Sequence, residues 1–94
     1  MVQTKDIINV LETIAPPRLQ ESYDNSGWVL GNPEQTCTGV LTALDLTPAV
    51  IEEAVAKNIN LIVVHHPPIF KGLKQLIPTN PVARMLTSAI KADL

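Results

Sequence analysis

The sequence is poor in the residues that mark several large classes of protein. Its 94 positions include one cysteine, 3% aromatic residues and 17% charged residues. The single Cys37 excludes an internal disulfide, so a reducing compartment is expected. The longest uninterrupted apolar run, residues 61–64, is too short to span a bilayer, and charges interrupt the first apolar stretch, unlike a signal peptide. We therefore expect a cytoplasmic protein without a membrane partner.

Basic runs and common catalytic signatures are absent as well. Seven basic and nine acidic residues give a net charge of −2, and they are spread along the chain. No phosphate-backbone footprint results, so we expect no nucleic-acid partner. The sequence has no nucleophile elbow and no dinucleotide fingerprint. Cys37 has no basic neighbour in sequence, which favours an ordinary thiol over a nucleophile.

What the sequence does contain is aliphatic side chains in regular patterns. Hydrophobic residues make up 46% of the chain, which is typical of a folded domain in which helices cover a sheet. Periods of 3.6 and continuous apolar runs predict three helices and two strands. In chain order these are a helix over 4–14, a strand over 39–46, a helix over 48–57, a strand over 60–64 and a helix over 81–91.

Local signals support the bounds of these helices. Thr4, Thr47 and Asn80 are predicted N-caps, with proline at the first position of the second and third helices. Asp6 suits the positive end of the first helix, and Pro16-Pro17 stop it. The apolar faces that we expect to be buried are Ile7, Val10, Leu11 and Ile14, then Ile51, Ala54 and Val55, and finally Val82, Met85, Leu86, Ala89 and Ile90.

The order of elements predicts an α/β fold: a partly parallel sheet with a βαβ unit and flanking helices. The continuous apolar run of 60–64 indicates a strand buried on both faces. A third strand is expected after the last helix, so residues 1–94 are read as a single α/β domain or as the N-terminal fragment of a larger one. In the alternative, Trp28 to Leu30 add an edge strand and the domain ends at Leu94.

The two histidines, His65 and His66, are adjacent and follow the second strand directly. Functional groups gather at the carboxyl ends of parallel strands, and Pro67-Pro68 stiffen the chain there. Neutral imidazole binds Zn, Fe, Ni and Cu, and adjacent histidines suit one ion each of a two-metal site. Two histidines are few ligands for a metal, however, so a structural pair stays open as the alternative.

Three other features carry weaker signals. Asp45 ends the first strand at the same edge of the sheet; a cap for the following helix is favoured over a metal ligand or general base. The stretch DNSG, residues 24–27, could form a tight turn or contact a ligand, and the tight turn is favoured. Lys71-Gly72 lacks the glycine-rich context of a phosphate loop.

Taken together, these stretches resemble the Ngg1-interacting-factor-three-like family, the type 2 GTP cyclohydrolase I homologues. The similarity lies in YDNSGWVLG (23–31), in LTALDLTPAVIEEAVAKNINLIVVHHPPIFKG (41–72) and in the leading helix. The family pattern is an aromatic-Asp-Asn-x-Gly, then Leu-Asp-x-Thr, then His-His-Pro and Phe-Lys, in this order and spacing. The resemblance extends over nearly all 94 residues.

The resemblance implies a longer α/β protein, a homo-oligomer that is commonly a ring-shaped hexamer, with two divalent metal ions per complete subunit. The metal is open among Zn, Fe, Mn, Ni and Mg, and His65 and His66 are the implied ligands. The family's further ligands, in a His-Thr-x-x-Asp segment and a His-x-x-x-Glu pair, are not in this sequence. The implied activity is metal-dependent hydrolysis of a nucleotide such as GTP, with these 94 residues alone inactive. A non-catalytic interaction module, or one that binds metal or nucleotide, is the alternative.

Overall fold

The computed structural model describes residues 1–15, 27–69 and 73–94, and contains three helices and two strands in these ranges. Their order is α1 (Thr4–Ile14), β1 (Val40–Ala43), α2 (Pro48–Ala56), β2 (Leu61–Val64) and α3 (Pro81–Lys91). The three predicted helices and both predicted strands are confirmed, with β1 shorter than expected at both ends. The predicted stop of α1 at Pro16-Pro17 lies outside the described residues.

The two strands pair in parallel and complete the predicted βαβ unit. Val40 lies opposite Leu61 and Ala43 lies opposite Val64. Backbone bonds extend the pairing beyond the strands, since the amide of His65 donates to the Ala43 carbonyl at 3.1 Å. The fold is therefore α/β with a small parallel sheet. Among the described residues, Trp28 to Leu30 form a loop and no edge strand.

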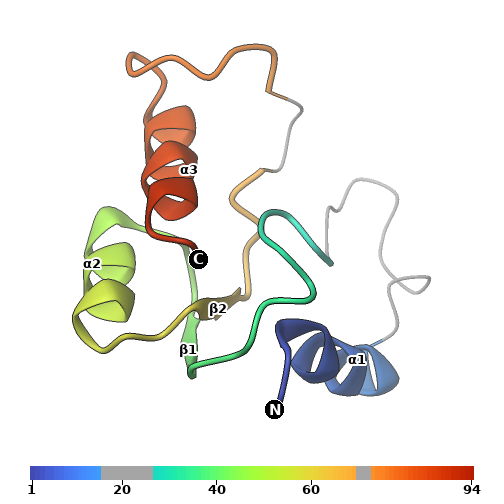
Figure 1. Ribbon diagram of the computed structural model, residues 1–94. Coiled ribbons are helices and arrows are strands. Elements are labelled where there is room, and N and C mark those ends of the chain that lie inside the picture. Colours follow the sequence, from blue (N-terminus) through green and yellow to red (C-terminus); the bar gives the residue numbers. More distant parts are fainter. Residues whose placement is uncertain (16–26, 70–72) are drawn as a thin grey trace.

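Helices α2 and α3 lie next to each other on one side of the strand pair, and α1 lies apart on the other side (Figure 1). The core sits between α2, α3 and the sheet. Its apolar members are small or medium in size, as expected for two helices that approach a sheet closely. They are Ile51, Ala54, Leu61, Ala83, Leu86 and Ala89.

The helix caps are partly as predicted. Thr47 Oγ1 accepts from the Val50 amide at 3.2 Å, and Asn80 Oδ1 accepts from the amide two residues on at 2.9 Å. The prediction for Thr4 was wrong, because Gln3 holds the N-cap position of α1. Thr4 is buried instead, and its hydroxyl donates to the Asn32 carbonyl at 2.8 Å.

Helix α1 is attached to the sheet through the segment of residues 32–38. The Thr4 amide donates to the Gln35 carbonyl at 2.9 Å, and Gln3 and Thr36 form an isolated antiparallel bridge. Asn60, directly before β2, then holds this segment from the other side. Its amide nitrogen donates to the Thr36 carbonyl at 2.7 Å, and its oxygen accepts from the Thr38 amide at 2.9 Å.

Two burial predictions were wrong, for the same physical reason. Only Leu61 of β2 is buried and the rest of the strand is half-buried, so the strand is not buried on both faces along its length. Several apolar side chains predicted to face a core are exposed as well, namely Val10, Leu11, Ile14, Val55 and Ile90. Their apolar periodicity records a preference for burial, but the described residues provide no surface to cover them.

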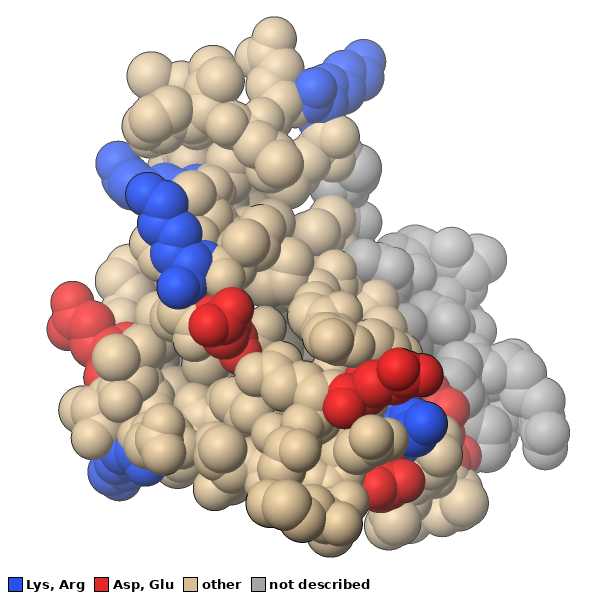
Figure 2. All heavy atoms as spheres, in the orientation of Figure 1, with Lys and Arg blue, Asp and Glu red and all other residues tan. Residues whose placement is uncertain are grey.

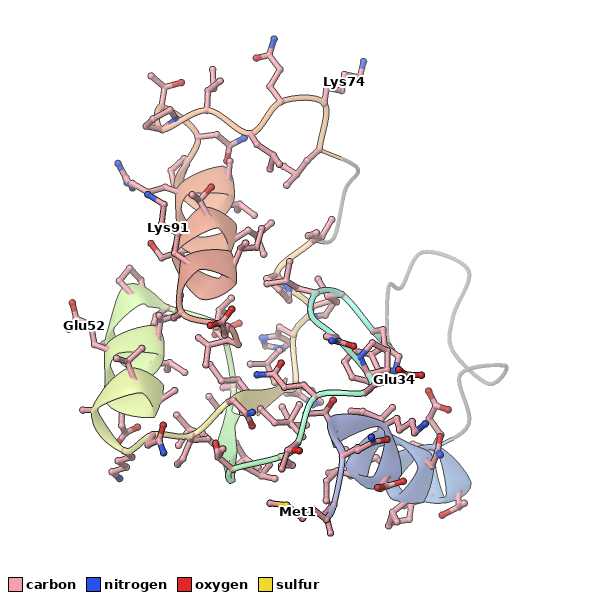
Figure 3. The ribbon with its side chains drawn as sticks, in the orientation of Figure 1. Met1, Glu34, Glu52, Lys74 and Lys91 are labelled. Carbon is pink, nitrogen blue, oxygen red and sulfur yellow. The ribbon has the colours of Figure 1, made fainter. Side chains whose placement is uncertain are left out.

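Charged side chains stand away from this core. Glu52 extends outward from α2 and Lys91 outward from α3 (Figure 3). On the face shown in Figure 2, acidic and basic side chains form small separate groups within a largely uncharged surface. None of the described helices is long and apolar enough to cross a membrane.

The difference between buried and exposed positions of α3 predicts the effect of truncating them. Leu86→Ala should lower the free energy of unfolding by about 2–5 kcal/mol, because a buried leucine leaves a cavity. Ile90→Ala on the same helix, where the side chain is 52% exposed, should cost less than about 1 kcal/mol. Urea unfolding followed by circular dichroism measures both, and equal losses would contradict the placement of the core.

Candidate metal centre at the carboxyl ends of the strands

The parallel pairing brings three side chains to the carboxyl ends of β1 and β2. Counting on from Ala43 opposite Val64, Asp45 falls opposite His66. The His66 amide donates to the Leu44 carbonyl at 2.9 Å, so the register holds up to this point. The sequence therefore positions Asp45 and His66 side by side through the register of the sheet rather than through a local motif.

Asp45 and His66 make a direct contact. The distance between Asp45 Oδ1 and His66 Nδ1 is 2.8 Å. Both side chains are more than half exposed, at 56% and 57%. A pair this exposed contributes about 0–1 kcal/mol to stability, so its geometric effect on the imidazole matters more than its energy.

The two imidazoles lie close together despite their adjacency in sequence. Their ring centroids are 4.8 Å apart and the ring planes are inclined at 57°. Side chains of consecutive strand residues point to opposite faces, but both histidines lie just beyond β2, where that alternation relaxes. Both imidazoles therefore lie together at the carboxyl edge of the sheet.

The prediction that Asp45 caps α2 was wrong. Thr47 is the N-cap, and its hydroxyl accepts from the Val50 amide. The carboxylate of Asp45 points to His66 instead. The missed signal was the register: aligning the carboxyl ends of the two predicted strands places Asp45 near the histidines.

The side chains at this edge are of the kinds that bind divalent transition metals, but there are too few of them to complete a site. Two imidazole nitrogens and a nearby carboxylate are ligands that such ions accept. Within residues 1–15, 27–69 and 73–94, no group of three or more His, Cys, Asp or Glu side chains is arranged to hold an ion. The described residues thus offer two neighbouring nitrogen ligands, which is half of an ordinary site.

A hollow of about 300 Å³ lies beside the histidines, between α1, β2, α3 and the loop that follows Gly27. Its lining is mainly apolar, and it reaches His65, Pro67 and Pro68. Side chains of the surrounding elements also line it, among them Ile8, Trp28, Ile62, Val64 and Leu86. All four residues of β2 contribute to its lining, in keeping with the incomplete burial of that strand.

The other candidates from the sequence lie away from this edge or outside the described residues. Cys37 precedes β1, at the opposite end of that strand from Asp45, and its Sγ lies 3.5 Å from the Gly39 carbonyl oxygen. Of DNSG only Gly27 is described; its φ of 106° suits glycine and agrees with a turn. Lys71-Gly72 lie outside the described residues.

An α/β protein with side chains for chemistry at the carboxyl edge of its parallel strands is a broad class. Comparison with known proteins identifies the family within this class. The chain belongs to the Duf34/NIF3 (NGG1p interacting factor 3) family, whose model matches residues 2–94.

Relatives of known sequence carry the name GTP cyclohydrolase 1 type 2 homolog. The Clostridium perfringens protein is 39% identical over 93 residues, which cover 99% of this chain and 36% of that protein. A Staphylococcus aureus protein is 46% identical over 89 residues, covering 95% of this chain and 24% of that protein. The chain therefore spans roughly a quarter to a third of the length of these relatives.

Solved structures show the same fold. Staphylococcus aureus protein SA1388 superposes with a TM-score of 0.93 at 38% identity, over 99% of this chain and 30% of that one. A Bacillus cereus protein related to NIF3 gives 0.92 at 31% identity, over 99% of this chain and 26% of that one. HcgD from Methanocaldococcus jannaschii, in its reduced form, gives 0.87 at 26% identity, over 98% of this chain and 37% of that one.

The reassignment of the α2 cap predicts distinct effects at two neighbouring positions. Thr47→Ala should accelerate hydrogen exchange of the Val50 amide and destabilise the chain by about 1 kcal/mol, because the cap bond is lost. Asp45→Ala should leave exchange at Val50 unchanged. Amide exchange followed by NMR measures both, and faster exchange at Val50 in Asp45→Ala would restore the capping role.

Proposed function

We propose that His65 and His66 are ligands of a two-metal site, and that the complete site belongs to a metal-dependent hydrolase acting on a nucleotide such as GTP. The observation that carries the proposal is the pair of imidazoles with centroids 4.8 Å apart at the carboxyl ends of the strands. Ions of two-metal sites lie about 3.5–4 Å apart, a spacing that two neighbouring rings suit with one ion each. Family membership and the names of the relatives support the same reading.

The two histidines and the two prolines that follow them have different parts in the proposed site. His65 and His66 bind one divalent ion each through a ring nitrogen, and Pro67 and Pro68 stiffen the chain that follows them. The remaining ligands come from outside these 94 residues. Bound divalent ions would supply Lewis acidity and activate water for attack on the purine ring. The metal is one of Zn, Fe, Mn, Ni or Mg.

The location of the protein and its oligomeric state are part of the same proposal. The single Cys37 supports a cytoplasmic setting, since secreted domains of this size commonly carry disulfides. The exposed apolar side chains of α1, among them Val10 and Ile14, support burial against further protein. We propose a homo-oligomer, a hexamer by family resemblance.

The ligand assignment predicts weak but histidine-dependent metal binding by this chain. Wild type should bind Zn²⁺ weakly, because two protein ligands are fewer than the three or four of stable sites. His65→Ala and His66→Ala should each raise the Kd by about tenfold or more, a loss of about 1.4 kcal/mol or more. Equilibrium dialysis with metal analysis measures this.

Cys37→Ser is the matched control, because it removes the other strong zinc ligand of the chain from the far end of β1. Its Kd should equal that of wild type. Equal zinc binding by wild type and both histidine variants would refute the ligand assignment. For catalysis, GTP turnover should be measured in the full-length Staphylococcus aureus relative, with the residues that align with His65 and His66 replaced by alanine.

The hollow beside His65 favours a second candidate, a non-catalytic module that binds a nucleotide or a protein segment. Its mainly apolar lining and its volume of about 300 Å³ resemble a small-ligand site. Trp28, the single tryptophan, lines it and reports on occupancy. Saturable quenching of Trp28 fluorescence by GTP without metal supports this candidate. Unchanged fluorescence, together with turnover by the full-length relative, favours the hydrolase.

A further inference from the structure

The contact between Asp45 and His66 sets the two histidines apart from each other. His66 Nδ1 lies 2.8 Å from Asp45 Oδ1, whereas in the described part of the chain the ring nitrogens of His65 have no such partner. The two rings are neighbours in sequence and in space. One is thus tied to a carboxylate and the other is not.

This contact determines which nitrogen of His66 carries the proton. An ionised carboxylate only accepts hydrogen bonds, so the nitrogen that faces it must be the one that bears hydrogen. In a neutral imidazole the other nitrogen then has a free lone pair. With Nδ1–H donating to Asp45, the free nitrogen of His66 is Nε2.

The register of the sheet fixes the position of the carboxylate. Asp45 falls opposite His66 because Ala43 pairs with Val64 and the backbone bonds continue to the His66 amide. Thr47, two residues further on, caps α2, which leaves the Asp45 carboxylate free to meet the ring. Ligating histidines commonly donate their second nitrogen to a carboxylate, which orients the ring and raises its basicity.

We propose that Asp45 is a positioning residue: it holds His66 as the Nδ1–H tautomer and so presents Nε2 to a divalent metal ion. This inference rests on the proposed function, in which His66 is a ligand. It assigns different roles to the two side chains in contact, since Asp45 acts through His66 and is not itself a ligand. It also makes His66 the preorganised member of the histidine pair.

The first test reads the tautomer without metal. Two-bond ¹H–¹⁵N correlation spectra of the labelled chain, with both rings neutral, show which nitrogen is protonated. His66 should be in the Nδ1–H form in wild type, and should shift toward the mixture of a free imidazole in Asp45→Ala. His65, without a carboxylate, is the internal reference and should be the same in both. A wild-type His66 protonated at Nε2, or one unchanged in Asp45→Ala, would overturn the proposal.

The second test measures zinc affinity by equilibrium dialysis. Asp45→Ala should raise the Kd by about 10–100-fold, as expected when the partner of a ligating histidine is lost. The matched control is Glu53→Ala, which removes another half-exposed carboxylate, paired with Lys57 at 3.2 Å on α2 and away from the histidines. Its Kd should stay at the wild-type value.

The results separate this inference from the proposed function. Zinc binding that depends on His66 but not on Asp45 overturns the positioning role and leaves the ligand assignment intact. Weaker binding in Asp45→Ala with the His66 tautomer unchanged makes Asp45 a direct ligand and also overturns the inference. Binding that depends on neither histidine refutes the proposed function itself.

Discussion

The parallel pairing of β1 with β2 is the constraint on which the rest of this structure depends. Four residue pairs, from Val40–Leu61 to Ala43–Val64, set one register, and two further backbone bonds carry it past the strand ends. A shift by one residue would turn every side chain of the strand to the other face. It would also separate Asp45 from His66. The register thus links the packing of the core to the geometry of the candidate metal centre.

Much of the fold could be predicted because its signals are local. Apolar periodicity, the proline after the caps of α2 and α3 and the continuous run before His65 locate α1, α2, α3 and both strands. The position of the histidines at the carboxyl edge follows from the βαβ pattern. The cap at Thr4 was wrong because Gln3, one residue earlier, takes that position when the loop of residues 32–38 binds the Thr4 hydroxyl. That contact joins residues far apart in sequence.

The candidate site could be predicted only in part, for a related reason. The histidines lie in one short motif, whereas the contact of Asp45 with His66 joins residues 21 apart in sequence through the register of the strands. Burial was overestimated at Val10, Ile14 and Ile90, because periodicity shows which face prefers burial and not what covers it. The incomplete burial of β2 and the hollow beside it show the same effect at the sheet.

The chain belongs to the Duf34/NIF3 family and spans only part of the length of its relatives. These two facts suggest one explanation for the incomplete metal site and for the exposed apolar side chains. In the proposed function, further protein would supply the remaining metal ligands and would cover exposed apolar side chains such as Val10 and Ile14. In the proposed function, these 94 residues would supply a folded framework and two histidine ligands of the site. Hydrolysis would belong to the complete assembly of ligands.

The most direct test of this account is an anomalous difference map from crystals of the chain grown with Zn²⁺. We expect peaks at bonding distance, about 2.0–2.1 Å, from Nε2 of His66 and from a ring nitrogen of His65, with Asp45 still in contact with Nδ1 of His66. Zinc bound elsewhere, for example at Cys37, with no peak at either histidine, would contradict it.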